Sequence, residues 1–142
     1  MSKTEQILRL SWTERRWVLE AWLLLLGFRV ALRSRPFPSV EKWARVPVVE
    51  TPPTEEATRE DYSRLAWCVD AAANNHLWRM QCLERSLTRQ RMLRQRGLDA
   101  ELKIGVQKQG TELEAHAWLE LTGRPLNEPE AIAERFLPLL SK

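Results

Sequence analysis

The alternation of apolar with other side chains from Glu112 to Leu121 restricts the fold of this 142-residue chain more than any other feature. A period of two residues is typical of a β-strand with one buried face. The segment from Ala100 to Gln107 alternates in the same way, and residues 108–111 provide a turn between the two. We therefore expect a small antiparallel sheet whose apolar face is covered by helices.

The rest of the chain supplies those helices. Ser11–Glu14 fits a capping box, in which the serine side chain accepts from the third helical N–H group, so a long helix should follow to about Leu32. Apolar residues surround most of its circumference, which predicts burial on several sides. The other helices are predicted over residues 39–45, 54–73, 82–96 and 129–140.

Length and composition indicate one soluble domain, with 44% hydrophobic and 29% charged residues. Residues 1–53 form a helical amino-terminal part that ends in a Pro-rich connection, and residues 54–142 form the remainder. The predicted class is α+β, in which the amino-terminal helices and the helix that begins at Cys82 pack on a small antiparallel sheet.

The two cysteines and the absence of a secretory signal favour a reducing, cytoplasmic compartment. The most apolar stretch, residues 21–28, is far shorter than the roughly 20 residues that span a bilayer. An amphipathic interfacial helix over residues 17–32 is the alternative to a buried core helix there. The sequence contains no metal-ligand spacing and no Gly-rich phosphate loop, so we expect no metal or cofactor.

The net charge of +3 reflects an arginine-rich segment. Most of these arginines fall outside the helical arc that contains Cys82, Ser86 and Leu93, which is typical of a solvated helix face. A surface for an acidic peptide or partner is one alternative, and nucleic acid is another, although no nucleic-acid motif is present. The arginines are Arg79, Arg85, Arg89, Arg91, Arg94 and Arg96.

Cys82 and His116 are the candidate catalytic pair. A thiol in the first turn of a helix lies near unpaired N–H groups and the positive end of the helix dipole, which favour the thiolate. A histidine on a strand can accept the thiol proton and return it to a leaving amine. Cys68 lacks a helix start and is expected to serve packing alone, and His76 is a weaker candidate base because nothing fixes its ring.

Five segments follow one another in the block from about Trp78 to Glu128. They are Cys-Leu-Glu-Arg-Ser-Leu from Cys82, Leu-Arg-Gln-Arg-Gly-Leu to Leu98, Leu-Lys-Ile-Gly-Val from Leu102, Ala-His-Ala-Trp-Leu-Glu to Glu120 and Gly-Arg-Pro-Leu-Asn-Glu to Glu128. In this order they resemble the lasso peptide biosynthesis B2 proteins, which are leader peptidases with a transglutaminase-like, papain-like core.

The resemblance implies a cysteine peptidase that removes the leader from a ribosomally made precursor peptide. Its third catalytic residue would be Glu128, where the family commonly has an aspartate; Asn127 is the alternative that would orient His116. Because the chain starts directly with the Trp-rich helix, we expect it to depend on a separate leader-recognition protein. An ATP-dependent, asparagine-synthetase-like macrolactam cyclase would use the product.

Two other classes of function fit the same residues. A transglutaminase-like acyltransferase would form the same thioester and pass it to an amine instead of water. A noncatalytic peptide-binding adaptor would need the fold and a groove but no thiol.

Overall fold

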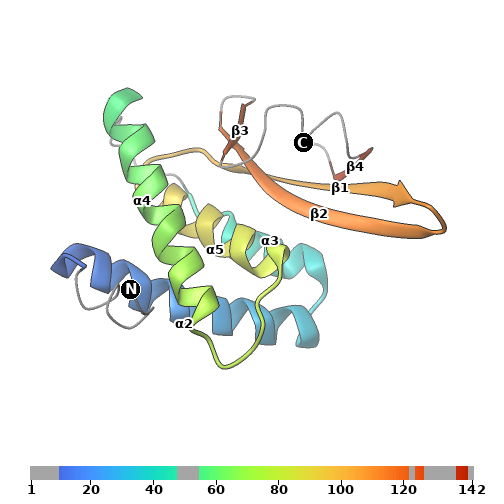
Figure 1. The fold of residues 1–142 in the computed structure, drawn as a ribbon, viewed down its shortest axis with the longest axis horizontal. Helices are drawn as coiled ribbons and strands as arrows, with labels where there is room; N and C mark the ends of the chain where they lie inside the picture. The colour runs from blue at the N-terminus through green and yellow to red at the C-terminus, as the bar shows by residue number, and fades with distance from the viewer. Residues whose placement is uncertain (1–9, 48–54, 122–123, 127–136, 141–142) are drawn as a thin grey trace.

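The computed structural model describes residues 10–47, 55–121, 124–126 and 137–140. These residues form a helical layer packed against an antiparallel sheet (Figure 1). The helices are α2 (Trp12–Ser34), α3 (Phe37–Ala44), α4 (Glu55–Asn74) and α5 (Cys82–Arg94), and the strands are β1 (Glu101–Gln109), β2 (Glu112–Leu121), β3 (Arg124–Leu126) and β4 (Leu137–Leu140). The predicted α+β class is confirmed.

The sheet has the strand order β3-β2-β1-β4. β1 and β2 form the predicted hairpin, and Gly110, at its turn, has a φ of 63° that glycine adopts without strain. Leu102 lies opposite Leu119 in this pair and Gly105 lies opposite His116. Both leucines contact the helical layer. Because successive side chains of a strand point to opposite faces, His116 lies on the face away from these leucines.

The predicted closing helix over residues 129–140 is wrong at its end, because Leu137–Leu140 is a strand that pairs with β1. Residues 129–136 lie outside the described part of the chain. The outer edge of β1 offers unpaired N–H and C=O groups, and pairing satisfies them better than an isolated helical turn would. A short apolar run such as Leu-Pro-Leu-Leu does not by itself distinguish the two structures.

Helix α2 begins as the sequence predicts, since the Ser11 side chain accepts from the N–H of Glu14 at 3.3 Å. Ala21, Leu25 and Phe28 on one face of the helix are fully buried. On the opposite face, however, Leu23 and Val30 are 56% and 58% exposed. The expectation of burial on several sides is therefore wrong, because α3, α4 and α5 pack on α2 and leave this face uncovered.

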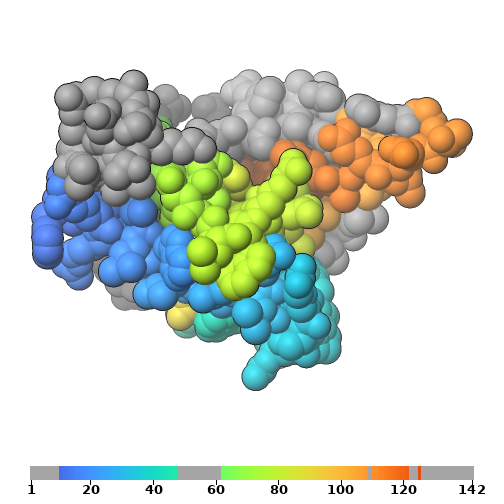
Figure 2. Space-filling view, turned by 60° about the horizontal axis from the view of Figure 1, so that its bottom comes forward, coloured from blue at the N-terminus to red at the C-terminus, as the bar shows by residue number. Residues whose placement is uncertain are grey.

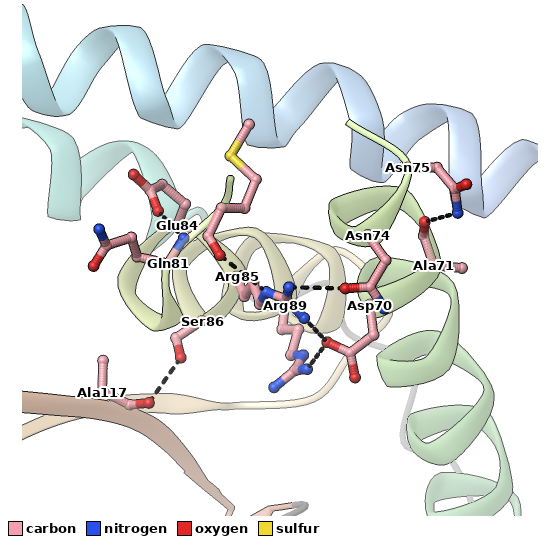
Figure 3. A network of polar contacts seen from close by, with 11 residues as sticks. Asp70, Ala71, Asn74, Asn75, Gln81, Glu84, Arg85, Ser86, Arg89 and Ala117 are labelled. Carbon is pink, nitrogen blue, oxygen red and sulfur yellow. Dashed lines mark hydrogen bonds and ion pairs between the residues drawn. The ribbon is translucent and has the colours of Figure 1, made fainter. Parts of the chain in front are cut away.

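The arginines of α5 are largely engaged within the chain. Arg85 and Arg89 both form ion pairs with Asp70 of α4 (Figure 3). Arg96, two residues after the end of α5, pairs with Glu20 of α2 at 3.1 Å, and Arg91 donates to the carbonyl of Trp43 in α3 at 2.6 Å. The interpretation of this surface as a solvated face is wrong for these side chains, since they connect α5 to the surrounding helices.

None of the helices in the described ranges has the length and apolar character needed to cross a membrane.

Candidate active site

Cys82 is the first residue of α5 and is half-buried. The residue before it, Gln81, is extended, and its backbone N–H donates to the carboxylate of Glu84 at 2.6 Å. Glu84, in the first turn of α5, thus caps the amino terminus of this helix. The predicted helix start at Cys82 is confirmed. The thiol therefore lies at the amino-terminal end of α5.

That loop is fixed to α2 by His76. The His76 ring stacks on Trp22 at a centroid distance of 4.2 Å, and its Nε2 lies 3.1 Å from the Trp22 carbonyl. A carbonyl only accepts, so Nε2 carries the proton in this contact. The expectation that nothing fixes this ring is wrong, and the contact assigns His76 a structural role. Trp22, which precedes His76 by 54 positions in the sequence, therefore determines both the tautomer and the position of the His76 ring.

Two further contacts hold the same loop. The Arg29 guanidinium donates to the carbonyl of Arg79 at 3.1 Å, and the Arg85 side chain donates to the carbonyl of Met80 at 3.4 Å. Met80 is buried in the main core cluster. The approach to Cys82 is therefore held from α2 on one side and from α5 on the other.

His116 lies in β2 and is half-buried. Its ring stacks with that of Trp118 at a centroid distance of 5.9 Å and an interplanar angle of 19°. Trp118 is buried, and its indole N–H donates to Glu120 at 3.0 Å. The three side chains share one face of the strand, as the alternation predicted, and the tryptophan supports one side of the imidazole.

Ser86 joins the two candidate elements. Its hydroxyl donates to the backbone carbonyl of Ala117 at 3.2 Å (Figure 3). Ser86 is one turn after Cys82 on the same side of α5, and Ala117 is the residue after His116. The first turns of the helix that begins with the cysteine therefore lie against the backbone of the strand that carries the histidine, while strand alternation puts the His116 side chain on the face of β2 opposite to that of Ala117.

The predicted third residues, Glu128 and Asn127, lie outside the described residues and stay a prediction. The strand that leads to them is described. β3 runs antiparallel to β2, and its last residue, Leu126, is paired with Leu119. The chain in β3 thus travels from the end of β2 back in the direction of His116.

Cys68 differs from Cys82 in its surroundings. It is fully buried in α4, and its Sγ lies 3.8 Å from the carbonyl of Glu14. Burial, together with the negative charge of Glu14, raises the pKa of the Cys68 thiol from 9.0 to about 11. A thiol in this state is a poor nucleophile, which agrees with the packing role predicted for it.

The sequence reasoning missed two residues that shape this site. Glu84 is buried and caps α5, and a signal for it was present in the Gln81-x-x-Glu84 spacing of a capping box. Asp70 anchors two arginines of α5, and no local pattern connects it with them. Within the described residues, no cluster of three or more His, Cys, Asp or Glu side chains could hold a metal ion.

Comparison with known families identifies the superfamily to which this fold belongs. The model of the transglutaminase-like superfamily matches residues 22–141, which include every described strand and the whole of α5. The chain therefore belongs to the transglutaminase-like superfamily. This superfamily includes cysteine peptidases and acyltransferases and usually relies on a catalytic cysteine. No curated protein and no solved structure gives a match.

Proposed function

We propose that this protein is a cysteine peptidase that removes the leader from a ribosomally synthesised lasso precursor peptide. The contact between Ser86 and Ala117 is the observation that carries this proposal, because it joins the helix begun by Cys82 to the strand of His116. Membership of the transglutaminase-like superfamily supports thiol chemistry at this junction. The resemblance of the block from Trp78 to Glu128 to lasso B2 proteins supports the substrate class.

In the proposed reaction, His116 accepts the proton of the Cys82 thiol, and the sulfur attacks the carbonyl carbon that joins leader to core. The C–N bond then breaks, and His116 gives its proton to the departing amine of the core peptide. Water, activated by the same imidazole, hydrolyses the thioester and releases the leader as a carboxylic acid. The free enzyme is regenerated with its thiol protonated.

The oxyanion of the tetrahedral intermediate needs preorganised N–H donors. The N–H of Gln81 is already bonded to Glu84, so it is not available for this purpose. The N–H of Cys82, at the open end of α5, is the donor that we assign. We assign Glu128, or Asn127 in its place, to orient the imidazole.

The partners follow from the same proposal. A separate leader-recognition protein would present the precursor, and an ATP-dependent macrolactam cyclase would consume the core with its new amino terminus. We place the reaction in the cytoplasm, where the thiol of Cys82 stays reduced. Both cysteines are free in the structure.

The test is cleavage of the precursor in the presence of the leader-recognition protein, followed by mass spectrometry. Cys82→Ala and His116→Ala should abolish cleavage, and Glu128→Ala should reduce it more than Asn127→Ala does. Cys68→Ala is the matched control and should retain activity. Cleavage that persists in Cys82→Ala would refute the mechanism.

The same experiment separates the two rival functions. An acyltransferase would give a leader whose mass is increased by an added amine rather than by water. For an adaptor, the Cys82→Ala variant would still support formation of the mature peptide in a reaction that contains all the partners.

A further inference from the structure

One face of α2 is apolar and uncovered. Leu19, Leu23 and Val30 are each more than half exposed, and Trp12 at the start of the helix is 74% exposed. At 100° per residue these four side chains fall within an arc of about 40°. Their spacings of seven, four and seven residues are those of the seam along which one helix packs on another.

The surface beside this seam is concave. A groove of about 740 Å³ lies between α2 and α3, and it is lined by Leu23, Gly27, Val30, Arg35 and Trp43 among others. A second hollow of about 430 Å³ lies nearer the start of α2 and shares Leu23 with the first. In Figure 2 the cyan surface that contains α3 stands out beside the blue surface of α2. We call the combined surface the α2–α3 groove.

Gly27 and Trp43 build the floor of this groove. A Cβ atom at position 27 would lie 2.9 Å from Cη2 of Trp43, so the ring reaches this position only because residue 27 has no side chain. Phe28 contacts the same ring at a centroid distance of 4.8 Å, and the Arg91 guanidinium lies 5.4 Å from it. The tryptophan is thus fixed in place although 41% of it is exposed.

The charges along the groove are positive. Arg16 lines the hollow near the start of α2, Arg35 lines the larger groove, and Arg33 is exposed in the last turn of the helix. None of the three forms an ion pair with another described residue. The one carboxylate that lines either hollow, Glu20, is paired with Arg96 at 3.1 Å.

We propose that the α2–α3 groove binds an amphipathic helix of a partner protein, with apolar residues along one side and acidic residues beside them. The seam from Trp12 to Val30 is about 27 Å long at the rise of an α-helix, which suits a partner helix of about 18 residues. Acidic side chains on that helix would pair with Arg16, Arg33 and Arg35. This interaction is independent of the peptidase activity proposed above.

Two other occupants fit the groove less well. A second copy of the chain would bring Arg16 against Arg16 in a parallel arrangement, or against Arg33 and Arg35 in an antiparallel one, and like charges would repel. An anionic membrane would attract the arginines, but an interfacial helix inserts a protruding apolar face, whereas α3 and Trp43 form a wall beside Val30.

The test uses a fluorescein-labelled, alanine-based helical peptide of about 18 residues, with leucines at the seam spacing and glutamates beside them. The control peptide carries lysines in place of the glutamates. Fluorescence anisotropy with the full chain should show binding of the acidic peptide and at least about tenfold weaker binding of the basic one. Equal binding of both peptides, or binding of neither, would overturn the proposal.

Variants locate the binding. The double change Arg33→Glu and Arg35→Glu should weaken binding of the acidic peptide at least about tenfold. Lys108→Glu, a charge reversal on the exposed hairpin, should leave the affinity for this peptide within about twofold of that of the unchanged chain. Gly27→Ala should also weaken it, because the added Cβ displaces Trp43 into the groove. An unchanged affinity in all groove variants would contradict this location.

The remaining outcomes identify another occupant. Dimerisation of the chain alone in sedimentation velocity, lost in Leu23→Ala, would show that a second copy fills the groove. Co-sedimentation with vesicles of phosphatidylglycerol and phosphatidylcholine that is lost in Leu23→Ala, without binding of the acidic peptide, would assign the face to a membrane. Either result refutes the partner helix.

Discussion

The hydrogen bond from Ser86 to the carbonyl of Ala117 is the direct link between the cysteine helix and the histidine strand, and Ser86→Ala removes its donor. Ser86 is 2% exposed, so water would not readily replace the lost hydroxyl. A buried acceptor without a partner costs about 1–3 kcal/mol. Alanine in a helix interior returns about 0.5 kcal/mol relative to serine. The free energy of unfolding should therefore fall by about 0.5–2.5 kcal/mol.

Ser34→Ala is the matched control for this prediction. The Ser34 hydroxyl also donates to a backbone carbonyl, that of Val30 at 2.9 Å, but this contact is exposed and lies within a single helix. Its loss should change the free energy of unfolding by less than about 0.5 kcal/mol. Urea denaturation followed by tryptophan fluorescence measures both variants.

The same pair of variants tests the geometry of the site. If Ser86 holds Cys82 and His116 in register, Ser86→Ala should lower kcat for precursor cleavage even under conditions where the variant is fully folded, while Ser34→Ala should not. If Ser86→Ala is as stable and as active as Ser34→Ala, the reasoning that this bond positions the two elements is refuted.

Three further predictions concern the cysteines and the arginines of α5. Because the pKa of Cys68 is raised, the unfolded chain loses this proton at a lower pH than the folded one, so the stability contributed by the protonated thiol is lost between about pH 9 and 11. Urea denaturation across this range should show a smaller loss in Cys68→Ala; an identical loss contradicts the assignment. Iodoacetamide at about pH 8 should modify Cys82 before Cys68, as peptide mass mapping will show, and the reverse order would be inconsistent with their surroundings. Asp70→Asn should destabilise the protein by about 1–2 kcal/mol because two arginines lose a partner, whereas Glu41→Gln, which removes a single pair with Arg45 at the end of α3, should cost less than about 0.5 kcal/mol; equal denaturation midpoints would count against the network.

Local patterns predicted most of the elements correctly. The capping box at Ser11 marked the start of α2, and the alternation after Ala100 marked both strands of the hairpin. Gly97 has a φ of 89° beyond the end of α5, a left-handed conformation that glycine adopts readily after a helix. Each of these signals depends on residues within one turn or one strand pair, so the sequence contains it directly.

Only part of the candidate site could be predicted from such local patterns. The position of Cys82 at a helix start is a local property and was predicted, and the common face of His116 and Trp118 follows from the strand period. The position of His76 could not be predicted from the sequence, because its ring is held by the side chain and the carbonyl of Trp22 in α2. Glu128 and Asn127 stay predictions, because they lie outside the described residues.

The sequence by itself determined where the helices and the central hairpin form, since backbone hydrogen bonds and side-chain periodicity act over a few residues. Tertiary packing decided which face of α2 is buried, which arginines of α5 find a carboxylate, and that Leu137–Leu140 adds a strand to β1. These outcomes depend on which segments meet in space. An apolar face is buried only where another element covers it, and a charge is paired only where the fold brings its partner within reach.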